Sequence, residues 1–128
     1  MNVASTAAFQ PVPYMSVYGA TKAFVLSFTE SLYGQYQSDK LRFLALCPGP
    51  TATPFFETAG NEEANLGARD TPENCVRTAL KALDQGKNYV IPGPLATYLL
   101  AQVSRFVPRK LVIGLAEGIL RPKGLKRA

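Results

Sequence analysis

A tyrosine and a lysine stand four residues apart in a segment that is predicted to be helical, in the run Tyr18-Gly-Ala-Thr-Lys22. This spacing places the two side chains one above the other on one face of a helix. A phenol is a weak acid at neutral pH, but a fixed cation beside it stabilises the phenolate. The pair therefore has the chemistry of a general acid and base. On spacing alone, an exposed pair on an amphipathic helix is the simpler interpretation.

Ser5 precedes Tyr18 by thirteen residues (18 − 5 = 13) and follows the short run Asn2-Val3-Ala4. We expect this run to end a strand, so that the Ser5 hydroxyl lies at the carboxyl edge of a sheet, where α/β proteins bind ligands. Taken alone, Ser5 is equally a helix-cap or turn serine. The chain has no histidine, which excludes Ser-His-Asp and Cys-His hydrolases and histidine metal sites. No metal site is predicted.

The remaining segments alternate between strand and helix patterns. Short strands are predicted at residues 2–5, 42–47 and 89–91, and the second is an apolar run that ends in Pro48-Gly49. Helices are predicted at about 16–36 and from the capping signal at Thr71 to Gly86. Between Pro50 and Asp70 the periodicity is lost, which is typical of a functional loop or lid. The order indicates an α/β fold with a parallel sheet.

Apolar stripes predict which faces of the two helices are buried. The long helix carries Ala20, Phe24, Phe28, Leu32 and Tyr36, and the second helix carries Val76, Ala79, Leu80 and Leu83. Further apolar residues on the long helix indicate burial on a second side, against a partner subunit in a homo-oligomer. We expect Cys47 and Cys75 to be buried apolar thiols.

The 128 residues fit one globular domain, and their formal net charge is +5. Residues 95–128 hold seven basic residues and one acid (+6), whereas residues 1–94 hold seven basic and eight acidic residues (−1). This basic tail allows three interpretations: a solvated terminus, a segment on an anionic membrane surface that uses 95–103 and 111–116, or a site for an anionic substrate group. Nucleic acid is not an expected partner. Without a signal peptide pattern, we expect a cytoplasmic protein, peripheral to a membrane if the second interpretation holds.

Together, the segment Asn2-Val3-Ala4-Ser5, the pair Tyr18 and Lys22, and the strand end Pro48-Gly49 resemble the C-terminal half of the short-chain dehydrogenase/reductase family. The resemblance covers residues 1–93 or so, and the domain is assigned to residues 1–94, with 95–128 as a tail. It implies part of a Rossmann-type doubly wound parallel sheet. It further implies an NAD(P)-dependent oxidoreductase that transfers a hydride between the nicotinamide and a small carbonyl or alcohol substrate. The tail is loosely similar to that of acyl-chain reductases in the family.

The resemblance also implies a role for each residue of the site. Ser5 would polarise the substrate oxygen, Tyr18 would be the general acid and base, and Lys22 would favour the phenolate and bind the nicotinamide ribose. The cofactor would be lined by Pro48, Gly49 and Thr51, with Thr53 at the carboxamide or a phosphate. NADP is our working choice of cofactor. Phe55 and Phe56 are assigned either to a substrate pocket or to the core.

In the family, the glycine-rich phosphate loop lies before the serine that Ser5 matches. The residues that precede Ser5 in this sequence do not contain such a loop. Gly114 and Gly118 form a GxxxG run, but Leu120 occupies the position of the third glycine. We therefore expect a chain that begins midway through a dehydrogenase. Two alternatives to the oxidoreductase remain, a truncated non-catalytic remnant acting as an interaction or membrane-surface protein, and an epimerase or dehydratase on the same scaffold.

Overall fold

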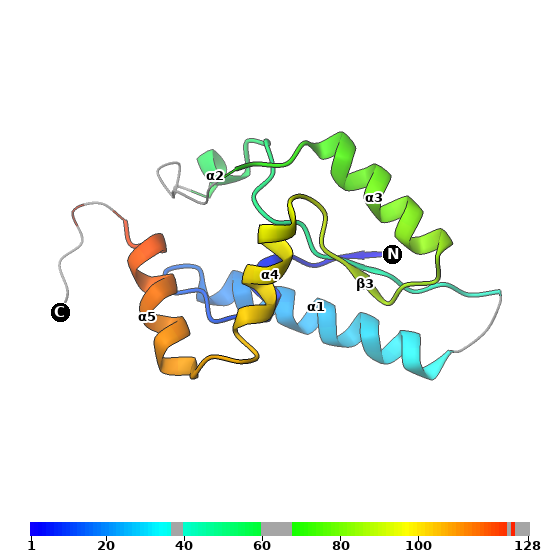
Figure 1. Ribbon diagram of the computed structural model, residues 1–128, viewed down its shortest axis with the longest axis horizontal. Coiled ribbons are helices and arrows are strands. Elements are labelled where there is room, and N and C mark those ends of the chain that lie inside the picture. Colours follow the sequence, from blue (N-terminus) through cyan, green and yellow to red (C-terminus); the bar gives the residue numbers. More distant parts are fainter. Residues whose placement is uncertain (37–39, 60–67, 123, 125–128) are drawn as a thin grey trace.

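The computed structural model describes residues 1–36, 40–59, 68–122 and 124, except for the side chain of Phe56. Three short parallel strands form a sheet in the order β1 (Asn2–Val3), β2 (Ala45–Leu46) and β3 (Tyr89–Val90). Helix α1 (Ser16–Gln35) lies on one face of this sheet and helix α3 (Pro72–Asp84) on the other (Figure 1). The predicted α/β fold with a parallel sheet is confirmed.

Strand β2 explains why its sequence is a continuous apolar run. Ala45 and Cys47 pack with Leu26 of α1, whereas Leu44 and Leu46 pack with Ala79 and Ala82 of α3. Because successive side chains of a strand point to opposite faces, both sets must be apolar when helices cover both faces. The strand β2 thus contributes side chains to both halves of the core.

Helix α3 starts and ends where its sequence predicts. The Thr71 hydroxyl accepts a hydrogen bond from the Asn74 amide at 3.2 Å, Pro72 occupies the first turn, and Gly86 follows with a φ of +67°. The predicted apolar stripe is partly wrong, because Val76 and Leu80 are exposed. The buried residues are Cys75, Ala79 and Ala82. Small side chains on this face let the helix approach the sheet closely.

The stripe predicted to be buried on α1 is also wrong. Phe24 is 68% exposed and Ala20, Phe28 and Tyr36 are exposed, while Leu32 is half-buried. The buried positions are Gly19, Leu26 and Thr29. Thr29 is tolerated there because its hydroxyl donates to the Val25 carbonyl at 2.7 Å and accepts from the Asn2 side-chain amide at 3.0 Å. The inner face thus combines Leu26 with a small and a satisfied polar residue, while the aromatic residues of the predicted stripe are exposed.

Two short elements precede and follow the middle strand. The 3-10 helix η1 (Thr6–Phe9) follows β1, and helix α2 (Phe55–Thr58) lies in the long connection between β2 and α3. The predicted loop at 50–70 therefore contains one helical turn. Residues 60–67 of it lie outside the described residues.

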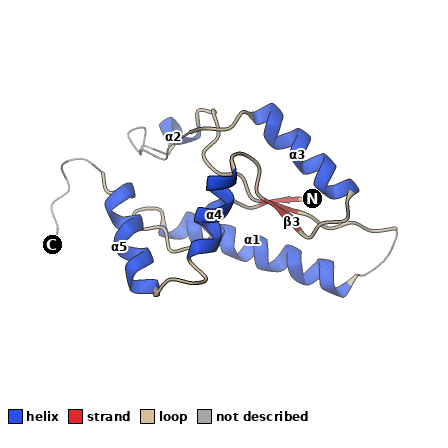
Figure 2. Ribbon diagram, in the orientation of Figure 1, coloured by secondary structure: helices blue, strands red, loops and turns tan. Residues whose placement is uncertain are grey.

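The predicted tail contains two helices, α4 (Leu95–Val103) and α5 (Arg109–Leu120), shown in Figure 2. Ser104, which follows α4, donates a hydrogen bond to the Phe9 carbonyl at 2.6 Å, and Gln102 donates to the Tyr89 hydroxyl at 3.0 Å. These bonds fix α4 to η1 and β3. The sequence indicated apolar stretches here but did not predict helices.

Candidate active site

Ser5 lies directly beyond β1, at the carboxyl edge of the sheet. Its side chain is buried, and its hydroxyl oxygen accepts a hydrogen bond from the Ala7 amide at 3.1 Å, so it caps η1. The same oxygen lies 3.5 Å from the Pro48 carbonyl, to which the Thr6 amide also donates at 2.9 Å. The structure therefore brings Ser5 and Pro48 together where β1 and β2 end.

Tyr18 and Lys22 lie in the first turns of α1, as their spacing predicts. The Lys22 ammonium nitrogen is 5.7 Å from the centroid of the Tyr18 ring and donates to the Val3 carbonyl at 2.9 Å. This bond joins α1 to β1, two residues before Ser5. An ammonium group has three donors, so the bond to Val3 leaves capacity for a ligand. Lys22 is thus held as a fixed cation beside the phenol.

Phe55 of α2 also contacts Tyr18. The two ring centroids are 5.3 Å apart and the rings are inclined at 45°, within the range of a favourable aromatic pair. The loop after β2 therefore supplies an apolar side chain next to the phenol. The backbone of Phe56 belongs to the same helix, but its side chain lies outside the described part of the chain.

The segment after β2 holds the other predicted cofactor residues. The Thr51 hydroxyl donates to the Gly49 carbonyl at 3.1 Å, and Thr53 is exposed. A side chain at Gly49 would meet the Thr97 methyl group of α4 at 2.6 Å, so glycine is needed for α4 to pack here. Gly49 therefore has a packing role that its sequence position did not reveal.

Asp70 closes the base of the loop, a role that the sequence did not predict. Its amide donates to the Pro50 carbonyl and its carbonyl accepts from the Ala52 amide, both at 2.9 Å. Its carboxylate accepts bonds from the Thr71 amide and the Asn74 side chain, both at 2.8 Å. The sequence did contain one signal for this role, because an aspartate stands directly before the capping residue Thr71.

Both cysteines are buried thiols, as predicted. Burial raises the pKa of the Cys47 thiol to about 12, and the nearby Glu30 carboxylate adds to this effect. Burial also raises the pKa of the Cys75 thiol, to which the Asp70 carboxylate contributes. Neither environment favours a thiolate nucleophile.

Tyr14 connects the segment before α1 to α5. Its φ is +65°, a conformation that a residue with a side chain seldom adopts, and its hydroxyl donates to the Glu117 carboxylate at 2.8 Å. Glu117 also pairs with Arg121. The bond to Glu117 raises the pKa of the Tyr14 phenol. Because Tyr14 lies two residues before the start of α1, this bond joins α5 to the segment that leads into α1.

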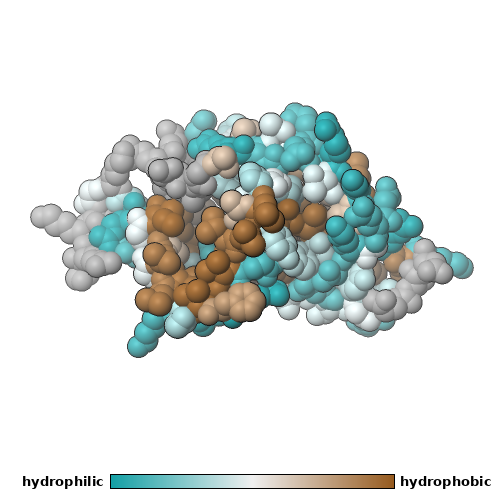
Figure 3. Space-filling view, viewed as in Figure 1, coloured by the Kyte–Doolittle hydropathy of each residue, from teal (hydrophilic) through white to brown (hydrophobic). Residues whose placement is uncertain are grey.

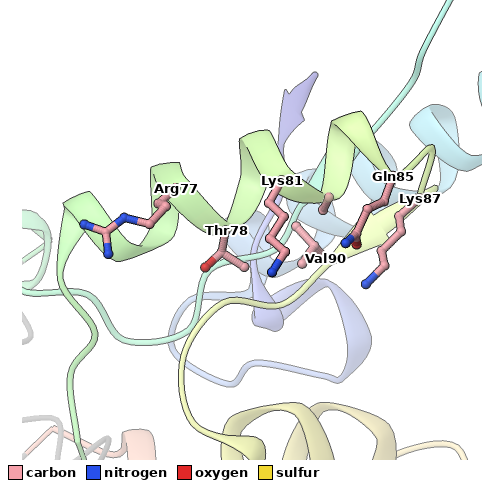
Figure 4. Close-up of a pocket in the computed structure, with 7 residues that line it drawn as sticks. Arg77, Thr78, Lys81, Gln85, Lys87 and Val90 are labelled. Carbon is pink, nitrogen blue, oxygen red and sulfur yellow. The ribbon is translucent and has the colours of Figure 1, made fainter.

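A hollow of about 440 Å³ lies elsewhere, along α3 and the start of β3 (Figure 4). It is lined by Arg77, Thr78, Lys81, Ala82, Gln85, Lys87 and Val90. None of the predicted site residues belongs to this lining. In the part of the chain that the structure describes, no group of three or more His, Cys, Asp or Glu side chains gathers as metal ligands would.

The chain belongs to the short-chain dehydrogenase family, whose model matches residues 1–64. That stretch contains Ser5, Tyr18, Lys22 and the segment after β2. The family assignment inferred from these residues is confirmed.

Three relatives show which activities similar proteins are named for. The chain is 28% identical over 131 residues to the very-long-chain 3-oxoacyl-CoA reductase of Mus musculus. The aligned region covers 99% of this chain and 40% of that protein. It is 28% identical to the mouse 17-beta-hydroxysteroid dehydrogenase type 3, over 87% of this chain and 34% of that protein. It is 32% identical to the short chain dehydrogenase asqE of Emericella nidulans, over 84% of this chain and 38% of that protein.

A solved structure has a similar fold. The short chain dehydrogenase of Burkholderia cenocepacia, crystallised with NADP, superposes with a TM-score of 0.66 at 23% identity, covering 90% of this chain and 46% of that chain. The Rossmann-type fold implied by the sequence is therefore confirmed. The chain spans between a third and a half of the length of these relatives.

Proposed function

We propose that the protein is an NAD(P)-dependent oxidoreductase that interconverts a carbonyl and an alcohol. The observation that carries the proposal is that Lys22 lies beside Tyr18 and donates to the Val3 carbonyl at the end of β1, two residues before Ser5. Membership of the short-chain dehydrogenase family supports the reaction class.

Each of the three residues has a role that its contacts support. In the reducing direction the Tyr18 phenol gives its proton to the carbonyl oxygen, and the Lys22 cation stabilises the phenolate that remains. The Ser5 hydroxyl accepts a bond from the Ala7 amide and donates a long bond of 3.5 Å to the Pro48 carbonyl. In the proposed reaction this hydroxyl hydrogen turns from the weak bond with Pro48 to the substrate oxygen.

The residues at this edge also fit the nicotinamide end of a dinucleotide cofactor. Lys22 supplies an ammonium, the backbone of Pro48, Gly49 and Thr51 lies in the segment that follows β2, and Thr53 adds an exposed hydroxyl. When bound, the nicotinamide supplies or accepts the hydride. The NADP in the Burkholderia structure supports NADP as the cofactor.

The substrate class is proposed from the surroundings of Tyr18. Phe55 places an apolar ring against the phenol, and the mouse relative is named for a 3-oxoacyl-CoA substrate. A small carbonyl or alcohol that carries an apolar or acyl chain fits both observations. The substrate loop would then be the connection that Asp70 closes.

The proposal is tested by turnover of the full-length protein with NADPH or NADH and a panel of ketones, 3-oxoacyl thioesters and alcohols. Tyr18→Phe should lower kcat by roughly a hundredfold to ten-thousandfold, because the proton donor is removed. Tyr36→Phe, at the residue directly after the same helix, is the matched control, and it should retain activity. Equal turnover of the two variants would refute the assigned role of Tyr18.

The exposed face of α1 supports the predicted homo-oligomer. Val17, Phe24 and Phe28 are exposed, and the two phenylalanine rings stack with centroids 5.8 Å apart. Replacing both with serine should lower the molar mass measured by light scattering if this face joins two copies. An unchanged mass would place any interface elsewhere.

A second candidate function is an interaction or membrane-surface role without catalysis. One observation favours it, the exposed apolar surface of α4 and α5. Tight NADPH binding together with turnover would exclude this candidate as the whole function of the protein.

A further inference from the structure

Apolar side chains gather on the surface of α4 and α5 (Figure 3). Phe106, in the turn between the helices, is 85% exposed, and Leu100 is 68% exposed. The other exposed members are Leu95, Tyr98, Leu99, Val103, Leu111, Ile113, Leu115 and Ile119. We call this set the α4–α5 apolar surface. A patch of this kind on a soluble domain usually marks an interaction site.

Helix α5 is apolar on two adjacent faces. Val112, Ala116 and Leu120 form a buried stripe, and Leu111, Leu115 and Ile119 form an exposed stripe one residue earlier. A helix on the surface of a globular protein normally has a polar outer face. The exposed stripe therefore exceeds what packing within the described fold requires.

The apolar surface belongs to helices that are firmly attached. Thr97 of α4 packs on Gly49, Ser104 bonds to Phe9, and Glu117 of α5 bonds to Tyr14. These contacts hold the inner faces of both helices. Their outer faces are thus presented in a fixed orientation.

The charges around this surface are positive. Residues 95–121 contain four basic residues and one acid, a net charge of +3. The acid, Glu117, is paired with Arg121. The other three cations, Arg105, Arg109 and Lys110, flank Phe106 in the sequence and are exposed.

The start of α5 adds to this positive potential. Its first turn holds Arg109 and Lys110 and no acidic residue, and the N-cap residue Pro108 makes no side-chain cap. The N-terminus of a helix carries a partial positive charge, so cations placed there are repelled by it. An anionic partner would reduce this repulsion. Apolar side chains between cations are the pattern of segments that lie on anionic bilayers.

We propose that the α4–α5 apolar surface docks onto the surface of an anionic lipid bilayer. Phe106 and the exposed leucines enter the boundary between headgroups and acyl chains, while Arg109 and Lys110 contact the lipid phosphates. No helix in the described part of the chain is long and apolar enough to cross a bilayer. The contact is therefore one of lying on the membrane and not of spanning it.

The test is binding of the full-length protein to vesicles of phosphatidylcholine alone or with phosphatidylserine, measured by flotation. We expect binding to the vesicles that contain phosphatidylserine, with affinity that falls as salt is raised. The double variant Arg109→Glu/Lys110→Glu should weaken this binding by roughly thirtyfold or more. Arg77→Glu/Lys81→Glu makes the same charge change on α3 and should bind as the unaltered protein does.

A second pair of variants tests the apolar part. Leu100→Ser/Phe106→Ser should reduce binding, whereas Val76→Ser/Leu80→Ser, which alters exposed side chains of α3, should not. Circular dichroism shows whether each variant is folded. Equal binding to both kinds of vesicle, or equal effects of the paired variants, would overturn the proposal. So would a protein that binds neither vesicle and forms a dimer that Leu100→Ser/Phe106→Ser dissociates, because a second copy would then occupy the surface.

Discussion

The middle of the sheet and the α4–α5 pair use similar side chains in opposite ways. Leu44, directly before β2, is completely buried against α3, whereas Leu100 of α4 is 68% exposed. The apolar residues of the first region are buried, and they hold in place the sheet edge that carries Ser5 and Pro48. The second region is held by a buried stripe on α5 and a few polar contacts, and many of its larger apolar side chains are exposed. The comparison separates residues that position the chemistry from residues that are available to a partner.

A matched pair of leucine substitutions tests this difference most strongly. Leu44→Ala should lower the free energy of unfolding by about 2–5 kcal/mol, because it leaves a cavity in the core. Leu100→Ala should change it by no more than about 0.5 kcal/mol. Urea unfolding followed by circular dichroism measures both. Similar losses for the two variants would show that α4 is buried in the folded protein.

Removing the Lys22 cation should affect activity more than stability. Lys22→Met should lower kcat by roughly a hundredfold, because the phenolate of Tyr18 loses its stabilising charge. Lys81→Met, which removes an exposed cation of α3, serves as the control. Retention of activity in Lys22→Met would restrict Lys22 to its structural bond with Val3.

The buried Cys47 thiol predicts a dependence of stability on alkaline pH. Its pKa is raised to about 12 in the folded protein, so the unfolded chain loses the proton first as pH rises above about 9. The contribution of Cys47 to the free energy of unfolding should therefore be fully present below that pH. Above it, the free energy of unfolding should fall by about 1 kcal/mol per pH unit. Urea unfolding of the unaltered protein should show this additional slope relative to Cys47→Ala. Parallel pH profiles would contradict the assigned burial.

The smallest effect is expected at the contact between Tyr14 and Glu117. Tyr14→Phe removes the hydrogen bond to the carboxylate while retaining the ring. Hydrogen exchange of the α5 amides should become faster, whereas exchange in α3 should stay the same. Unchanged exchange in α5 would mean that other contacts position this helix.

Much of the fold was predictable because local signals determine it. The Thr71-Pro72 cap, Gly86 and the apolar run of β2 each specify a conformation through a few neighbouring residues. The buried faces of α1 and α3 were harder to predict, because small or satisfied polar residues such as Thr29 and Ala79 can replace large apolar ones on an inner face. A stripe of large apolar residues on a helix therefore does not by itself show which face of that helix packs against the sheet.

The candidate site was predictable to a similar extent. The spacing of Tyr18 and Lys22 specifies a shared helix face, and the end of β1 specifies where Ser5 lies. By contrast, the bond from Lys22 to Val3, the closure of the loop by Asp70 and the contact of Gly49 with Thr97 join residues from different elements. Such contacts depend on how the elements pack, which no local pattern in the sequence encodes.

The central claim is that Tyr18 moves a proton while hydride passes between the cofactor and the substrate carbon. The direct measurement is a single turnover of the full-length protein with NADPH carrying deuterium at the transferred C4 position. We predict that deuterium appears on the carbon bearing the new hydroxyl group, and that Tyr18→Phe slows this transfer at an unchanged Kd for NADPH. Transfer at the same rate in Tyr18→Phe would contradict the claim.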